Sequence, residues 1–386
     1  MRVARPVRGR RERVGNTCSL TAVRRRARGL VVAVVAAAVA GLAAPAALAA
    51  EGGSYREIDL VSNVPGAAAI TDPNLVNAWG LAFSPSSPAW VADNGTGVAT
   101  LYRGGVAGTP PAIVPLVVGI PGGAPTGQVF NPTSGFVVHS GLSSGPARFL
   151  FASESGLITG WSPAVPPPPP STAAQVAVSS PGAIYKGLAL AATAGGPRLY
   201  AADFHNARID AWDAGFTPVA LPAGAFTDPA LASGFAPFNI QEIGGRLYVT
   251  YAKQDAAAED DVAGPGNGYL DVYDTDGSLL RRLVSAGRLN SPWGLAVAPR
   301  GFGRFSGALL VGNFGDGRIH AYDPLTGALR GTLLRGDGAP LEIDGLWALR
   351  FGNGVIGSPR TLLFTAGPDD ETNGLFGEIR TGDEDD

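Results

Sequence analysis

The pattern of hydrophobic and polar positions repeats along the chain after residue 75. A short apolar segment that begins Gly-Leu-Ala, or with a similar string, recurs about every 53 residues. The equivalent positions are Gly80, Gly135, Gly187, Asn239, Gly294 and Ala348, at separations of 55, 52, 52, 55 and 54 residues. A fixed period of this size is typical of a propeller, a solenoid or another array.

Each repeat is predicted to contain four strands separated by turns. The fifth repeat shows them most clearly, at residues 293–298, 308–313, 318–322 and 329–334. Between them lie turns rich in Gly, Pro and Asp. Four antiparallel strands in each of six units predict an all-β fold, a six-bladed β-propeller.

The sixth repeat supplies only three strands before the sequence runs out, at residues 347–351, 361–365 and 375–379. Residues 55–61 precede the first repeat and alternate polar and apolar positions, as a half-buried strand does. We expect this strand to complete the last blade, which would close the ring and remove an exposed sheet edge.

Small and very large side chains mark the first strand of several repeats. Glycines suit the crowded positions near the axis of such a ring. Trp79, Trp293 and Trp347 are predicted to wedge between neighbouring blades as core residues. The alternative for these tryptophans is a platform on which a ligand stacks.

The first fifty residues have the pattern of a secretory signal peptide. Residues 1–28 contain ten arginines and one acidic residue, residues 29–42 are apolar, and Ala47-Leu48-Ala49 is a small-x-small cleavage signal. We expect cleavage near Ala49 or Ala50, a single propeller domain at 51–380 and a short acidic tail at 381–386. A transmembrane anchor is the alternative, but fourteen apolar residues are too few to span about 30 Å of hydrocarbon. The route of export, general or twin-arginine, stays open.

Removal of that segment makes the chain acidic. The whole sequence has 29 basic and 32 acidic residues, and the part after residue 50 keeps 19 and 31. Such a charge excludes nucleic acid and anionic membranes as favourable partners and makes divalent or organic cations plausible. The single Cys and the single Met, Cys18 and Met1, both fall in the removed part, so no disulfide or thiolate site is expected. We expect an exported monomer without a membrane anchor.

The fifth repeat resembles an NHL repeat. The strings that carry this resemblance are Pro292-Trp293-Gly294-Leu295-Ala296, then Leu309-Leu310-Val311-Gly312-Asn313, then Gly317-Arg318-Ile319-His320-Ala321-Tyr322-Asp323. From about residue 55 to 380 the chain resembles a family of secreted bacterial NHL-like six-bladed propellers, which implies the fold and export but no established activity. The fold implied is distantly similar to that of calcium-dependent lactonases and phosphotriesterases.

Polar residues gather in two sets of loops that lie on one face of a propeller with this strand order. These loops precede the first strand of a blade or join its second and third strands. The candidate ligand-binding residues are Asn77, Asn94, Asn131, Lys253, Asn290, Asp344 and Asp369. We call this side of the ring the polar face.

The same loops offer oxygen ligands for a metal. Asp93, Glu154, Asp203 and Asn313 are the candidates, and Ca²⁺ is the ion that such ligands suit. A bound cation could polarise an ester or phosphoryl oxygen while a carboxylate activates water. His205 is the weak candidate for acid–base catalysis. The alternative is that these residues only make turns, which Asn, Asp and Gly favour.

Two functions follow from these patterns. The first is an extracellular binding module whose polar face takes a small molecule, a glycan or a protein. The second is a calcium-dependent hydrolase of small lactones, esters or phosphoesters. The sequence favours the first, because it offers no complete set of metal ligands together with a base, and it leaves open whether the chain is an enzyme.

Overall fold

The structure is a computed structural model that describes residues 53–106 and 108–382. These residues belong to one compact unit, Ala50–Asp386. The predicted signal peptide and the end of the acidic tail lie outside the described residues. Within the described ranges, the 3₁₀ turn Gly303–Phe305 is the only helical element, and no helix is long and apolar enough to cross a membrane.

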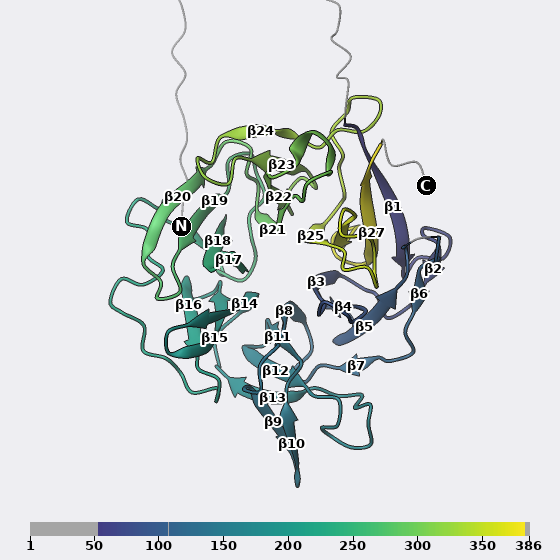
Figure 1. Ribbon diagram of the computed structural model, residues 1–386. Helices are drawn as coiled ribbons and strands as arrows, with labels where there is room; N and C mark the ends of the chain where they lie inside the picture. Colours follow the sequence, from purple (N-terminus) through teal and green to yellow (C-terminus); the bar gives the residue numbers. More distant parts are fainter. Residues whose placement is uncertain (1–52, 107, 383–386) are drawn as a thin grey trace, which may run out of the picture. The chain divides into compact units, whose positions relative to one another are not determined.

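Small antiparallel sheets follow one another along the chain and form the blades of a ring (Figure 1). Blade 1 contains β3 (Ala78–Ala82), β4 (Ala89–Asp93), β5 (Val98–Arg103) and β6 (Ala112–Ile113), with β7 (Val118–Gly119) also paired to β5. Blade 2 contains β8 (Pro125–Phe130), β11 (Phe149–Ser153), β12 (Leu157–Trp161) and β13 (Gln175–Ser179). Blade 3 contains β14 (Tyr185–Thr193), β15 (Gly196–Asp203) and β16 (Arg208–Trp212), and its outermost strand is reduced to a bridge between Trp212 and Pro218.

The second half of the ring is more regular. Blade 4 contains β17 (Phe235–Ile243), β18 (Arg246–Lys253), β19 (Tyr269–Tyr273) and β20 (Leu279–Ser285). Blade 5 contains β21 (Pro292–Val297), β22 (Leu309–Asn313), β23 (Ile319–Tyr322) and β24 (Leu329–Thr332). The described chain is therefore an all-β, six-bladed β-propeller, as the repeat predicted.

Blade 6 joins the two ends of the propeller. Its strands are β25 (Leu346–Phe351), β26 (Leu362–Ala366), β27 (Leu375–Thr381) and β1 (Tyr55–Ser62), with the short β2 (Ile70–Thr71) parallel to β1. The strands β1 and β27 pair antiparallel, from Tyr55 opposite Thr381 to Ser62 opposite Leu375. The predicted closure by the N-terminal strand is confirmed.

The repeat position of blade 2 was predicted wrongly. Its innermost strand is β8, so the equivalent of Gly80 and Gly187 is Gly127 and not Gly135. A two-stranded hairpin, β9 (Val137–Ser140) with β10 (Ser143–Pro146), is inserted between β8 and β11. Gly135 precedes this hairpin, and the apolar residues of the hairpin have the same sequence pattern as the first strand of a blade.

Glycine at the repeat position allows neighbouring blades to approach closely. A Cβ atom added to Gly80 would lie 2.3 Å from the Thr126 carbonyl oxygen of blade 2. A Cβ atom added to Gly127 would lie 2.6 Å from the backbone nitrogen of Leu188 in blade 3. Both distances are far below van der Waals contact, so a side chain at either position would push two blades apart.

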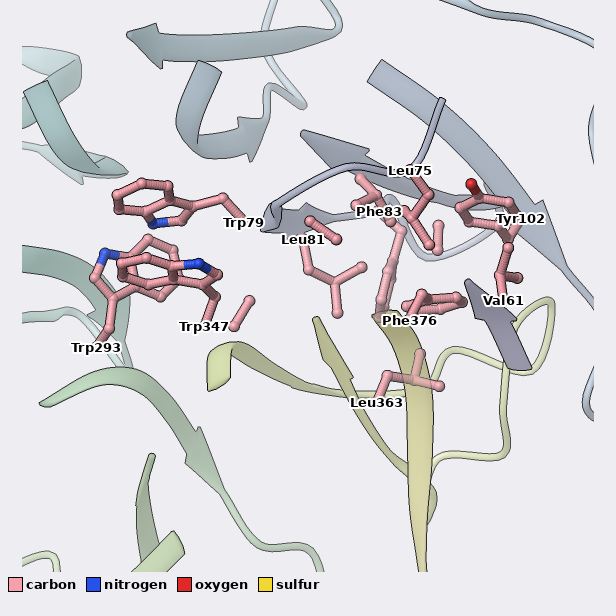
Figure 2. Close-up of a cluster of buried hydrophobic side chains, with 14 of the residues drawn as sticks. Val61, Leu75, Trp79, Leu81, Phe83, Tyr102, Trp293, Trp347, Leu363 and Phe376 are labelled. Carbon is pink, nitrogen blue, oxygen red and sulfur yellow. The ribbon is translucent and has the colours of Figure 1, made fainter. Parts of the chain in front are cut away.

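Three tryptophans fill the centre of the ring on the side of the polar face. The rings of Trp79 and Trp347 stack with centroids 3.6 Å apart, and Trp293 meets Trp347 edge to face at 6.0 Å. Their exposed fractions are 2%, 1% and 6%, and Figure 2 shows the three rings side by side. The prediction that they pack as core is confirmed, and they form an aromatic floor beneath the polar loops.

Candidate functional site

Lys186 is a buried cation close to this aromatic floor. It is the second residue of β14, one position before Gly187, and only 1% of it is exposed. Its Nζ donates to Glu154 Oε1 at 2.5 Å and to Asp260 Oδ1 at 3.2 Å, and lies 5.1 Å from the Trp79 ring centroid. The loops of blades 2 and 4 therefore neutralise a charge that blade 3 presents.

The two carboxylates keep Lys186 charged. Burial alone would lower the pKa of Lys186, because it penalises the ammonium form. The charges of Glu154 and Asp260, and their hydrogen bonds to Nζ, outweigh this effect, and the pKa is raised above its ordinary value. Lys186 is thus a fixed cation and not a base near neutral pH.

Two asparagines extend the network around the ring. Asn94, which follows β4, donates from Nδ2 to Glu154 Oε2 at 2.9 Å. Asn77, which precedes β3, donates to Asn94 Oδ1 at 3.3 Å and to Glu371 Oε2. Trp347 Nε1 in turn donates to Asn77 Oδ1 at 2.9 Å, so the aromatic floor orients the first amide.

Glu371 reaches this network from an unusual turn. Asp369, Asp370 and Glu371 are three consecutive non-glycine residues with positive φ, at 57°, 51° and 63°. Left-handed backbone of this kind costs free energy and persists only where the surroundings enforce it. Hydrogen bonds from the Glu371 amide to the Gly367 carbonyl (3.1 Å) and from the Asp369 amide to Asp344 Oδ2 (2.9 Å) hold the turn.

The environment of Glu371 makes it titrate near neutrality. Burial raises its pKa to about 7, the hydrogen bond from Asn77 opposes that rise, and the charge of Glu154 adds to it. A carboxyl group with such a pKa exchanges its proton in the physiological range. We refer to Asn77, Asn94, Glu154, Lys186, Asp260 and Glu371 as the axial network.

A cavity of about 300 Å³ opens beside the axial network. Its side-chain walls are Phe314, Asp344, Asp370 and Glu371. Phe314 follows β22 and stacks on Trp347, with ring centroids 3.9 Å apart, and it is partly exposed. Three acidic side chains and an aromatic ring therefore meet at one hollow of the polar face. We call this hollow the Phe314 cavity.

Three of the residues predicted to bind metal occupy equivalent places in different blades. Asp93, Asp203 and Asn313 each end the second strand of blade 1, 3 or 5, and each is fully buried. Asp203 accepts hydrogen bonds from the Ile184 and Asn206 amides, and Asn313 donates to the Arg288 carbonyl at 2.8 Å. Asp203 and Asn313 thus connect the turns of their own blades.

Glu154, the fourth of that set, belongs to the axial network instead. Burial raises the pKa of Asp93 well above its ordinary range, the hydrogen bond with Thr100 opposes that rise, and the nearby charge of Asp72 adds to it. Among residues 53–106 and 108–382, no group of three or more His, Cys, Asp or Glu side chains is arranged to hold a metal ion. The calcium site stays a prediction.

The remaining candidates are scattered. The placement of Asn131 on the polar face was wrong, because it rested on Gly135 as the repeat position of blade 2. Asn131 follows β8, at the far end of the blade from the polar face, and donates to the Ala147 carbonyl at 2.8 Å. Asn290 accepts from the Gly264 amide at 2.6 Å and so fixes a loop. Lys253 is exposed at the end of β18. His205 lies on the polar face, where its Nδ1 is 3.2 Å from the Ala258 carbonyl oxygen.

The sequence analysis missed Lys186 and did not select Glu371 or Asp260. A signal for Lys186 was present, since it stands one residue before a repeat glycine, where Trp79 and Trp293 stand in other blades. A lysine in place of an aromatic ring at the axis needs buried carboxylates around it. No comparable signal marks Glu371, because its backbone conformation is not evident from the residue types.

Comparison with known proteins places the chain in a family. It is 34% identical over 332 residues to protein R648 of Acanthamoeba polyphaga mimivirus, covering 83% of this chain and 78% of the viral protein. It is 33% identical over 341 residues to protein L690 of the same virus, covering 83% and 84%. Both are described as uncharacterized. The chain belongs to the family of these proteins. The resemblance noted in the sequence implied a bacterial family, but the viral members show that the family is not confined to bacteria. No family model matches the chain.

Solved structures with a similar chain path include two enzymes and a nidogen/laminin complex. A virginiamycin B lyase from Staphylococcus aureus matches with a TM-score of 0.48 and 10% identity, over 85% of this chain and 99% of the lyase. A PQQ-bound aldose sugar dehydrogenase from Streptomyces coelicolor matches with a TM-score of 0.46 and 14% identity, over 85% and 98%. Identities and scores this low say nothing about the activity of this chain.

Proposed function

We propose that this chain is a binding protein whose polar face takes a small organic cation in the Phe314 cavity. The observation that carries the proposal is the meeting of Asp344, Asp370 and Glu371 with the ring of Phe314 around one hollow. An ammonium group is attracted both by carboxylates and by the face of an aromatic ring. The acidic charge of the chain after residue 50 favours the same ligand class.

The axial network supports this choice of ligand. Lys186 is already paired with Glu154 and Asp260, so it does not cancel the charge of Asp344 and Asp370 at the cavity. Glu371 links the axial network to the Phe314 cavity, because its Oε2 accepts a hydrogen bond from Asn77 while its side chain lines the cavity. A cation bound there would favour the ionised form of Glu371. We further propose that the protein works outside the cell, on the basis of the signal-peptide pattern at residues 1–50.

Calorimetry with benzylamine tests the proposal, because this probe combines an ammonium group with an aromatic ring. We expect benzylamine to bind the full-length chain at pH 8, and neutral benzyl alcohol to bind far more weakly. Asp370→Asn should weaken benzylamine binding about fivefold, since it removes one exposed charge and Asn tolerates the left-handed backbone. The matched control is Asp337→Asn, an exposed residue of a distant loop.

Equal affinities for the amine and the alcohol, or for wild type and Asp370→Asn, would refute a cation site in this cavity. The same titration with Ca²⁺ addresses the calcium-dependent hydrolase, which stays a prediction. Tight Ca²⁺ binding that is lost in Glu154→Gln would favour that alternative, because Glu154 is the predicted metal ligand that the structure places in the axial network.

A further inference from the structure

A second cavity, of about 330 Å³, lies at the axis on the side away from the polar face. Its walls come from the second halves of the innermost strands, at residues 127–130 of β8, 188–192 of β14, 239–242 of β17 and 348–350 of β25. Leu81, Leu188 and Leu349 supply apolar side chains. A cavity of this size is at the small end of the range for ligand pockets.

Arg350 is the positively charged residue of this cavity. The repeat positions that correspond to it are Ala82 in blade 1 and Ala296 in blade 5, so the arginine is not required by the fold. Its guanidinium carbon lies 4.7 Å from the centroid of the Phe83 ring, which holds it against the wall. The side chain remains exposed to solvent. We call this hollow the Arg350 cavity.

Nothing in the described part of the chain neutralises this guanidinium. Neither a hydrogen bond nor an ion pair joins Arg350 to a side chain within residues 53–106 and 108–382. Arg350 thus differs from Arg282, another arginine of the ring, which is paired with Asp228 and Asp271.

Several other polar groups of the cavity are engaged, but Gln128 Oε1 is a buried acceptor without a hydrogen-bond partner among the described residues. Gln128 and Gln241 use their Nε2 atoms to bridge to the carbonyls of Gly80 (2.8 Å) and Leu295 (3.0 Å). Glu242 accepts from the Gly245 amide at 2.7 Å at the rim. Trp293 lines the cavity, is 94% buried, and has an Nε1 without a hydrogen-bond partner in the described chain. The groups left to meet a ligand therefore include a cation and an N–H donor, which suit a carboxylate, together with the acceptor Gln128 Oε1.

We propose that the Arg350 cavity binds a small amphipathic monocarboxylate. Its carboxylate would pair with the planar guanidinium of Arg350, which suits two-point contact with a carboxylate better than a point charge does. Its hydrocarbon part would pack on Leu81, Leu188 and Leu349. This site is separate from the Phe314 cavity and does not depend on the function proposed for the polar face.

Octanoate is the probe, with octanol as its neutral counterpart, and calorimetry on the full-length chain is the measurement. We expect octanoate to bind, and Arg350→Gln to weaken its binding by at least about tenfold, because a hydrogen-bonded charge pair is lost. Octanol should bind wild type and Arg350→Gln with equal, weaker affinity. The matched control is Arg300→Gln, which removes the same charge from an exposed turn and should leave octanoate binding unchanged.

A second variant tests the cavity itself. Ala192→Trp adds a large ring at an exposed lining position and should abolish octanoate binding while Arg350 remains. Asp370→Asn, at the other face, should have no effect on octanoate. The proposal is overturned if wild type does not bind octanoate, if Arg350→Gln binds it as tightly as wild type does, or if Ala192→Trp retains full affinity. Thermal melts of each variant confirm that it is folded.

Discussion

Lys186 occupies a position that aromatic rings occupy in several other blades. Two carboxylates from blades 2 and 4 stabilise its buried charge. Lys186→Met should lower the free energy of unfolding by about 1–3 kcal/mol, because Glu154 loses its partner in a partly buried place. Glu154→Gln should cost more, since Lys186 is almost completely buried. The double variant should cost clearly less than the sum of the two single changes. Urea unfolding of the four proteins measures this coupling, and additive losses would show that the pair is not coupled.

Glu371 should make stability depend on pH in a defined direction. Its pKa is raised from the ordinary value of 4.5 to about 7 in the folded chain. A carboxyl group with a raised pKa favours folding most below pH 4.5, and this contribution is lost as pH rises through 7. Glu371→Gln should therefore gain about 1–2 kcal/mol relative to wild type between pH 5 and pH 8, with allowance for solvent screening.

Urea unfolding of both proteins at the two pH values measures that difference. Wild type carries other carboxyls with raised pKa values, Glu57 and Asp271 among them, so the comparison with the variant isolates the contribution of Glu371. A difference between Glu371→Gln and wild type that is the same at both pH values would show that the turn does not perturb this carboxyl.

The pairing of β1 with β27 makes the N-terminal strand part of the last blade. Val61 is fully buried and Leu60 is 3% exposed, whereas Arg56 on the same strand faces solvent. Val61→Ala should lower the free energy of unfolding by about 2 kcal/mol, and Arg56→Ala should change it by less than about 0.5 kcal/mol. Removal of the chain through Ser62 should destabilise the whole ring, because β27 becomes an open edge. Unchanged thermal unfolding of the truncated chain would contradict closure by this strand.

The blades could be predicted from the sequence because each one obeys the same local rules. Five of the six repeat positions and the closing strand were predicted correctly. The prediction used small residues at the axis, alternating polar and apolar positions in the strands, and turns rich in Gly, Pro and Asp. The repeat position of blade 2 was predicted wrongly because the inserted hairpin segment is also apolar. Its residues Phe136 and Val138 are 0% and 2% exposed, as residues of a blade strand are. An apolar pattern does not distinguish a strand at the axis from a buried strand elsewhere.

The candidate site was only partly predictable because residues from five blades meet in it. The loops that carry Asn77, Asn94 and Glu154 could be chosen from strand order, since the repeat fixes which turns share a face. The selection of partners within that face could not be predicted. It depends on side-chain reach across the axis, as from Lys186 to Glu154, and on the left-handed turn that aims Glu371.

At the scale of the whole molecule, we propose that the polar face is a binding surface for cations and that the aromatic floor supports it. The most direct test is a crystal structure of the full-length chain with 4-iodobenzylamine, in which the anomalous signal of iodine locates the ligand. We predict one strong peak in the Phe314 cavity, with the ammonium group near Asp370 and Glu371. A peak elsewhere on the ring, or none at a concentration that saturates binding in solution, would contradict the account.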